Sequence, residues 1–366
     1  MFLDGPEYRS QYSQADKPRR DVRRPEVPYY EGQILSIKRH VPMEPFGIGY
    51  QKGGPQRRPV HHFDIQATDV EWYLSHPLIE TPAHHDQTVH QLHIGKSISI
   101  REDRAVQVVR CKVDGDGADL VAKIYDPLYY PFVSDITWEA DRDYSQEAAA
   151  YEDLQKSGQD GVLVPKYYGS WTVDMPLLEP SATLPRPVRM ILIQWIDAES
   201  MFALTESDEA YKIDPKRRLD MLGQALEAKS KLQFYGIQTR DFAPRNILVA
   251  GHDTPDFKVW LIDFNHCIVR SRPRAEKPQV LEERPISPLY FFWDHRDNEF
   301  IDWLPVPHRH NTKVYNGWLM SVWGDGKREG FGTFPESWEM RDLRMGEGTY
   351  TFMEPLPDVG KHTNWG

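Results

Sequence analysis

Three short segments rich in β-branched and other apolar residues follow one another in the first half of the chain, and they constrain its fold more than any other feature. They are residues 97–100, 105–113 and 120–125, and their length and composition predict strands. The sequence Asp114-Gly115-Asp116-Gly117 predicts a hairpin turn between the last two. A helix over 144–155 and a wholly apolar strand over 188–196 are expected to follow. This part of the chain should therefore form a mostly β lobe.

The second half of the chain changes to helical spacing. Apolar residues recur at helical intervals over 217–234, which predicts a long amphipathic helix. Two short strands are predicted at 246–249 and 259–262, on either side of a loop at Gly251, and the aromatic stretch 289–303 predicts one more helix. A β-rich lobe followed by a compact, mainly α lobe gives an α+β fold class with two lobes.

The segments outside these lobes differ in composition. Residues 1–65 are rich in Pro, Gly, Arg and Gln, which is typical of a disordered or loosely attached leader, and 66–97 is expected to be a linker. The two lobes are assigned to 98–197 and 198–305. Residues 306–366 are rich in glycine and aromatic residues and are expected to form an irregular tail.

Charge and cysteine usage exclude several classes of function. The formal net charge of −11 argues against a protein that coats nucleic acid. The two cysteines, Cys111 and Cys267, lie far apart without metal-ligand spacing, so neither a disulfide scaffold nor a structural zinc site is expected. No segment approaches the roughly 18 apolar residues that span a bilayer, and the start of the chain lacks a signal-peptide pattern. We therefore expect an intracellular protein, cytoplasmic or nuclear, with no nucleic-acid or membrane partner.

Four polar residues stand in an order that suits phosphoryl transfer. This reaction needs a cation on the phosphates, oxygen ligands for Mg²⁺, and a carboxylate beside the acceptor hydroxyl. Lys123 lies on the third predicted strand, where alternation can point it into a cleft. Asp241 and Asn246 are five residues apart in a predicted tight loop, and Asp263 follows a short hairpin. Carboxylate and amide oxygens are the hard ligands that Mg²⁺ prefers.

An acidic partner for Lys123 is expected in the helix that follows it. Glu147 is the first candidate, because a carboxylate on this helix can hold the lysine extended. Glu139, Asp143 and Glu152 are competing candidates that the sequence leaves open.

The two polar motifs of the second half resemble those of protein kinases. The segment Thr239-Arg240-Asp241-Phe242-Ala243-Pro244-Arg245-Asn246 resembles the catalytic loop His-Arg-Asp-x-x-x-x-Asn, and Asp263-Phe264-Asn265 resembles the metal-binding Asp-Phe-Gly. The resemblance covers about residues 98–305. It is strongest with divergent protein-kinase-like proteins of filamentous fungi, through Ala122-Lys123-Ile124-Tyr125-Asp126-Pro127 and the helix motif Glu147-Ala148-Ala149-Ala150-Tyr151.

This resemblance implies a two-lobed protein-kinase-like fold and an ATP- and Mg²⁺-dependent phosphotransferase. Asp241 would be the catalytic base, Asn246 and Asp263 the metal ligands, and Lys123 the phosphate clamp braced by Glu147. Arg245 is similar to a residue in the catalytic loop of tyrosine kinases and joins the candidate catalytic residues. The acceptor would be a hydroxyl of protein Ser, Thr or Tyr, or of a small molecule, since the compact second lobe also resembles antibiotic and choline kinases.

The departures from the kinase pattern suggest a second function. No Gly-x-Gly-x-x-Gly lies between the first two predicted strands, where residues 101–104 read Arg-Glu-Asp-Arg, so the amides that cover the phosphates are not obvious. Thr239 replaces the motif His. Asn265 replaces the motif Gly, and it is expected to tolerate positive φ at this turn. No Ala-Pro-Glu follows. The alternative is accordingly a pseudokinase, a binding or scaffold module with weak or no turnover.

Overall fold

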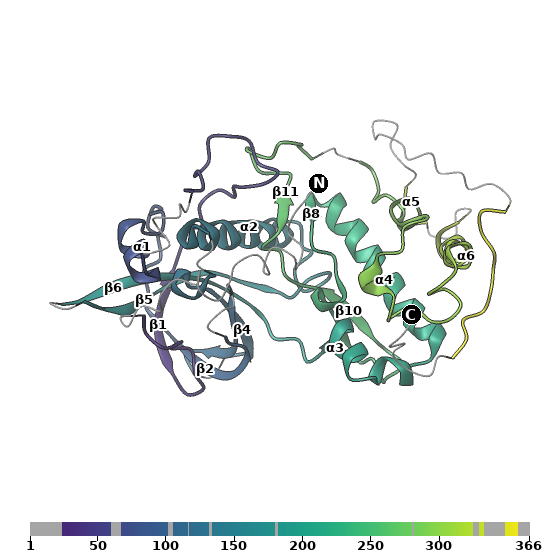
Figure 1. The fold of residues 1–366 in the computed structure, drawn as a ribbon, viewed down its shortest axis with the longest axis horizontal. Coiled ribbons are helices and arrows are strands. Elements are labelled where there is room, and N and C mark those ends of the chain that lie inside the picture. Colours follow the sequence, from purple (N-terminus) through teal and green to yellow (C-terminus); the bar gives the residue numbers. More distant parts are fainter. Residues whose placement is uncertain are drawn as a thin grey trace. The chain divides into compact units, whose positions relative to one another are not determined.

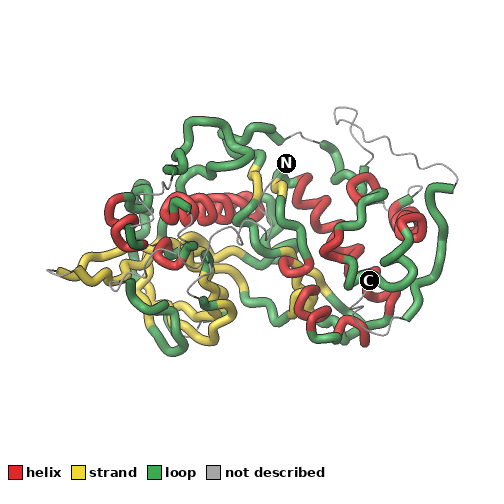
Figure 2. Tube along the Cα trace, viewed as in Figure 1, coloured by secondary structure: helices red, strands yellow, loops and turns green. Residues whose placement is uncertain are grey.

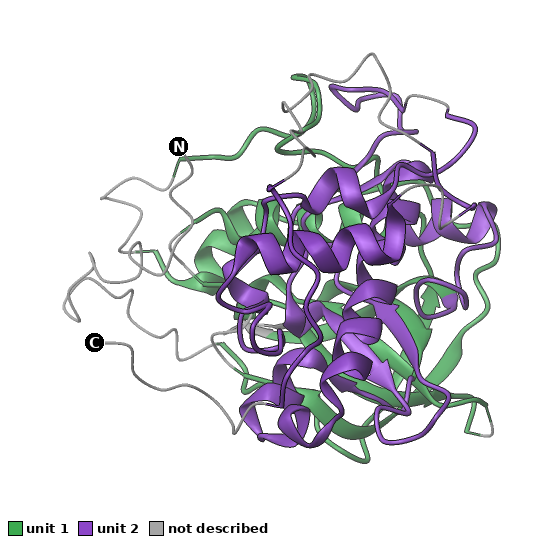
Figure 3. Cartoon of the chain, turned by 90° about the vertical axis from the view of Figure 1, so that its right-hand side faces the viewer, with its two compact units in different colours: residues 1–149, 168–195 green, residues 150–167, 196–366 purple. Residues whose placement is uncertain are grey.

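The chain divides into two compact units. The structure is a computed structural model, and it describes residues 24–59, 67–101, 105–115, 117–131, 134–179, 182–279, 282–324, 329–332 and 348–357. Unit 1 comprises residues 1–149 and 168–195, and unit 2 comprises 150–167 and 196–366 (Figure 3). The division falls within helix α2 (Ile136–Lys156), whose last seven residues belong to unit 2.

Unit 1 is built on a closed six-stranded barrel in the order β1-β2-β3-β4-β6-β5. Most of its strands and helices are labelled in Figure 1, and Figure 2 colours strands and helices separately. The elements are β1 (Ile34–Arg39), α1 (Asp69–Ser75), β2 (His90–Ser99), β3 (Gln107–Val113), β4 (Leu120–Tyr125), η4 (Pro127–Tyr129), α2, β5 (Tyr167–Glu179) and β6 (Ala182–Gln194). The strands predicted over 105–113 and 120–125 are thus confirmed to within two residues. The strand predicted over 188–196 is also present as β6, but it begins six residues earlier, at Ala182.

The barrel begins earlier in the chain than the sequence indicated. Strand β1 lies inside the predicted leader and β2 begins inside the predicted linker, and β1 closes the barrel by pairing with both β2 and β5. Both segments form strands because apolar residues alternate with polar ones over a short stretch. Leu35 and Ile37 are buried on β1, as are Leu92 and Ile94 on β2. Residues 34–39 and 90–97 therefore belong to the barrel and not to a loose leader or linker. Residues 1–23 and 60–66 of the predicted leader and linker lie outside the residues that the structure describes.

Unit 2 is organised around the long helix α4 (Pro215–Phe234). Asp214 caps it by accepting from the backbone N–H groups of Lys216 and Arg217, and Pro215 stands at its start. Its leucines and alanines are buried, as the spacing predicted. The helix packs on β10 and β8. The remaining elements are β7 (Glu199–Ser200), α3 (Met201–Glu206), η5 (Glu209–Lys212), β8 (Ile237–Thr239), η6 (Pro244–Asn246), β9 (Ile247–Ala250), β10 (Lys258–Leu261), β11 (Cys267–Val269), α5 (Pro288–Phe292), η7 (Asn298–Phe300) and α6 (Thr312–Trp323).

Two predictions for the end of unit 2 are corrected. The single helix expected over 289–303 is two short pieces, α5 and η7, and Asp294 between them has a left-handed φ of 56°. The expected irregular tail contains helix α6, which Asn311 caps and whose Val314, Trp318 and Leu319 are buried. The sequence did not predict α6 because glycines and aromatic residues are intermediate or poor helix formers, whereas burial of its aromatic face stabilises it.

The predicted fold class is confirmed. Strands predominate in unit 1 and helices in unit 2, so the chain is α+β with a β-rich first part and a mainly helical second part. Among the described residues, no helix is long and apolar enough to cross a membrane.

Candidate functional site

Lys123 of unit 1 is held by a buried carboxylate on α2. Its Nζ atom lies 2.6 Å from Oε1 and 2.5 Å from Oε2 of Glu147. Tyr125, two residues further along β4 and therefore on the same face, donates its hydroxyl to Oε2 of Glu147 at 2.6 Å. Glu147 is 0% exposed and Lys123 8% exposed. A carboxylate this deeply buried needs such partners, because burial penalises an isolated charge severely.

The competing acids have other partners in the structure. Glu139 pairs with Arg57 and Arg142, and Asp143 pairs with Arg142. Glu152, in unit 2, pairs with Arg272. The structure thus brings Glu147, of the four candidates, to Lys123.

The loop that carries Asp241 is anchored by its own aromatic residue. It leaves strand β8, which pairs with β11 through Thr239 and Cys267, and the Arg240 N–H donates to the His266 carbonyl at 3.1 Å. Phe242 is buried, and its ring centroid lies 5.3 Å from that of Phe300 and 6.0 Å from that of Phe292. Packing of this ring fixes the backbone next to Asp241.

Asp241 accepts hydrogen bonds on both carboxylate oxygens. The Nη2 atom of Arg245 donates to Oδ1, and Nδ2 of Asn246 donates at 3.0 Å both to Oδ2 and to the backbone carbonyl of Asp241. Pro244 starts the single turn η6, which brings Arg245 and Asn246 back over Asp241. The structure therefore brings three predicted site residues together.

The motif Asp263-Phe264-Asn265 follows strand β10, which ends at Leu261. Strands β9 and β10 are antiparallel, with Ile247 opposite Leu261, and the Ile262 N–H donates to the Asn246 carbonyl at 3.0 Å. This pairing brings Asn246 and Asp263 to the same end of the hairpin. Asp263 itself has a φ of 69°, in the left-handed region. The expectation that Asn265 would take the positive φ at this turn is thus corrected, because among the described residues of the motif it is Asp263 that does so.

The residues around Asp263 suit a hard cation. The Nδ2 atom of Asn246 donates its hydrogen bonds to Asp241, so the side-chain oxygen Oδ1 of Asn246 can coordinate a metal. Oδ1 of Asn265 is buried and accepts no hydrogen bond from the described residues. Phe264 turns away into the core, where its ring packs edge-on against Tyr151 at 5.4 Å. The donor set fits Mg²⁺, although the described residues contain no cluster of three His, Cys, Asp or Glu side chains suited to a metal.

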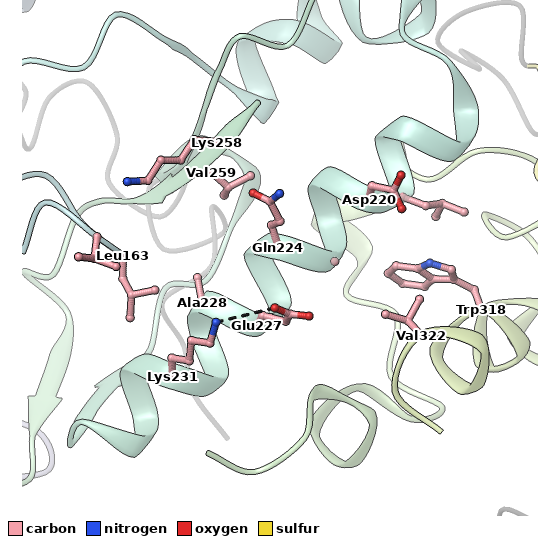
Figure 4. Close-up of a pocket in the computed structure, with 13 residues that line it drawn as sticks. Leu163, Asp220, Gln224, Glu227, Ala228, Lys231, Lys258, Val259, Trp318 and Val322 are labelled. Carbon is pink, nitrogen blue, oxygen red and sulfur yellow. Dashed lines mark ion pairs between the residues drawn. The ribbon is translucent and has the colours of Figure 1, made fainter. Parts of the chain in front are cut away.

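A separate cavity of about 460 Å³ lies along α4 (Figure 4). Asp220, Gln224 and Glu227 follow one another on one face of the helix, with Lys231 3.8 Å from Glu227. Trp318 of α6 faces the same cavity. None of the six candidate site residues lines it, so it is distinct from the loop of Asp241.

Two contacts of the site were missed by the sequence analysis. Tyr125 shares the carboxylate of Glu147, and its position two residues after Lys123 was an available signal. Glu299 on η7 accepts from Nη1 of Arg245, and because the two residues are 54 positions apart in the sequence, no local pattern could have indicated this contact.

One stretch of the chain matches the model of a kinase family. Residues 191–291 match the Lipopolysaccharide kinase (Kdo/WaaP) family. This match, which includes the segments of Asp241 and Asp263, confirms the predicted protein-kinase-like resemblance and supports the predicted class, a kinase-like phosphotransferase. It does not bear on the fungal subgroup. No curated protein sequence matches the chain.

Solved structures of two kinase domains are similar to part of this chain. One is the ROP18 kinase domain in complex with AMP-PNP and sucrose, with a TM-score of 0.36 and 16% identity over 50% of this chain and 54% of that one. Another is the BubR1 kinase domain, with a TM-score of 0.32 and 15% identity over 53% of this chain and 51% of that one. The chain thus spans about half the length of each. The kinase-like assignment rests on the family match and on the motifs.

Proposed function

We propose that the chain is an ATP- and Mg²⁺-dependent phosphotransferase that moves the γ-phosphoryl group to a hydroxyl acceptor, with Asp241 as the base. The observation that carries the proposal is the loop of Asp241, in which Arg245 and Asn246 orient a partly exposed carboxylate inside the segment that matches a kinase family. The acceptor would be a protein Ser, Thr or Tyr, or a small molecule.

In the proposed reaction, Asp241 accepts the proton of the acceptor hydroxyl. The acceptor oxygen then forms a bond to the γ-phosphorus, the bond from that phosphorus to the β,γ-bridging oxygen breaks, and ADP leaves. Hydrogen bonds from Arg245 and Asn246 hold the carboxylate of Asp241 in one orientation, so little reorganisation is needed when the hydroxyl arrives.

Asn246 and Asp263 would hold Mg²⁺ through an amide and a carboxylate oxygen. Bound there, the ion would neutralise charge that develops on the phosphate oxygens. Lys123, held extended by Glu147, would contact the nucleotide phosphates, since its ammonium group is fixed at the end of a buried ion pair.

Mg²⁺-dependent nucleotide binding tests the proposed ligands. Asp263→Ala should abolish the Mg²⁺-dependent part of the thermal stabilisation by ATP. The free variant should melt a few degrees lower than the wild type, because alanine is strained at the left-handed φ of this residue. Lys216→Ala is a suitable control, because its side chain is exposed in the first turn of α4 and belongs to neither motif. An unchanged Mg²⁺/ATP shift in Asp263→Ala would refute the metal assignment.

A further inference from the structure

Arg245 joins two carboxylates that belong to separate segments of unit 2. Its Nη2 donates to Asp241 and its Nη1 to Glu299. A guanidinium group carries five N–H donors, so three remain beyond these two bonds. The side chains of Arg245 and Glu299 are each 49% exposed. This guanidinium is therefore accessible to a dissolved ligand right beside the proposed base.

Glu299 is presented to Arg245 by a well-anchored turn. Asp297 caps η7 by accepting from the Glu299 N–H at 3.0 Å. The neighbouring Phe300 is buried and packs against Phe242, whose backbone adjoins Asp241. The backbone position of Glu299 is thus tied to the same aromatic cluster as the base, whereas its side chain can rotate into solvent.

We propose that Arg245 recognises an oxyanion, a carboxylate or phosphate, carried by the acceptor next to its reactive hydroxyl, and that Glu299 occupies this position until the acceptor binds. The inference rests on the proposed function, and it narrows the acceptor to an anionic class. The planar fork of a guanidinium matches the oxygens of either group.

The exchange of Glu299 for the oxyanion costs little on charge grounds. Asp241, Arg245 and Glu299 together carry a net charge of −1, and replacing Glu299 by an oxyanion of one negative charge leaves this sum unchanged. A half-exposed ion pair contributes little net stability, so its release costs little. An anion of the acceptor would otherwise be repelled by Asp241, and the bond from Arg245 offsets that repulsion.

The competition between Glu299 and the acceptor makes a directional prediction. Removing the charge of Glu299 frees the guanidinium, so an anionic ligand should bind more tightly to Glu299→Gln than to the wild type. Removing the guanidinium in Arg245→Gln should weaken the same ligand. If the ion pair were purely structural, both variants would bind the anionic ligand more weakly than the wild type.

Calorimetric titration of the full chain without nucleotide measures this directly. The probes are glycerol 3-phosphate with glycerol as its neutral match, and the peptide Glu-Glu-Ser-Glu-Glu with Gln-Gln-Ser-Gln-Gln as its neutral match. We expect Arg245→Gln to weaken the anionic probe about tenfold or more, as for a lost charge-assisted hydrogen bond. We expect Glu299→Gln to strengthen it roughly threefold, the range of an exposed ion pair.

The controls are two exposed or half-exposed side chains elsewhere in unit 2. Arg284→Gln removes an arginine that contacts a backbone carbonyl, and Glu209→Gln removes a carboxylate paired with Lys212. Neither should change binding of the probes. Should Arg245→Gln fold poorly, Arg245→Lys retains the charge without the fork and should show an intermediate loss.

Three results would overturn the proposal. The first is that Arg245→Gln binds the anionic probe as well as the wild type does, and the second is that Glu299→Gln binds it no more tightly than the wild type. The third is that the wild type prefers neither anionic probe over its neutral match. The probe that binds identifies the source of the oxyanion, a small molecule or an acidic peptide. Because no ATP is present, this outcome is independent of whether phosphoryl transfer occurs.

Discussion

Replacing Lys123 by methionine tests the energetic role of the buried pair in unit 1. The change removes both contacts of Nζ with Glu147, a carboxylate that is 0% exposed, and retains the hydrogen bond from the hydroxyl of Tyr125. Breaking a buried ion pair by removing one partner costs about 3–5 kcal/mol. For a unit of this size, that loss lowers the melting temperature by about 6–20 °C.

The double variant Lys123→Met/Glu147→Gln separates charge from packing. Glutamine keeps an acceptor for Tyr125 and carries no charge, so most of the lost stability should return. Urea and thermal unfolding followed by circular dichroism measure both variants. A loss below about 1 kcal/mol in Lys123→Met, the value of an exposed pair, would refute the assignment of a buried charge pair.

Two further predictions concern other parts of the chain. Burial raises the pKa of Asp141 to about 7, so the folded state holds a proton that the unfolded state has released, and stability falls as pH rises from about 4 to about 7. Urea unfolding at about pH 5 and about pH 8 should show the stability of Asp141→Asn relative to the wild type rising by about 2–3 kcal/mol, because about two pH units of this interval lie below the folded pKa. An equal difference at both pH values would contradict this. A Cβ atom on Gly317 would lie 2.1 Å from the Thr351 carbonyl oxygen. Gly317→Ala should therefore detach residues 348–357 from α6, destabilise by about 1–3 kcal/mol and speed proteolysis in that segment; unchanged cleavage would argue against the contact.

The sequence predicted the local elements and the motif residues better than it predicted their closure into a barrel. Strands β3, β4 and β6 are strongly apolar and were anticipated. Strand β1 is a short alternation within a Pro- and Gly-rich stretch, and it is stabilised by burial of Leu35 and Ile37 together with pairing to two distant strands. Non-local pairing of this kind leaves no local signal.

The same distinction applies to the candidate site. Fixed spacing along one loop predicted that Asp241, Arg245 and Asn246 act together, and the structure brings them into hydrogen-bonding contact. Glu147 was one of four acids at compatible positions, and packing of α2 on the barrel selects it. Glu299 reaches Arg245 through folding of the second half of unit 2, which no short motif encodes.

The most direct test of the proposed catalysis compares binding and turnover in Asp241→Asn. This variant removes the proposed base and leaves Lys123, Asn246 and Asp263 in place. We predict that the Mg²⁺/ATP thermal shift persists while phosphate transfer, assayed with radiolabelled ATP across peptides and small-molecule alcohols, falls by at least roughly 10², as for a positioned general base. Equal and negligible transfer by the wild type and Asp241→Asn, with nucleotide binding intact in both, would contradict catalysis and support a pseudokinase.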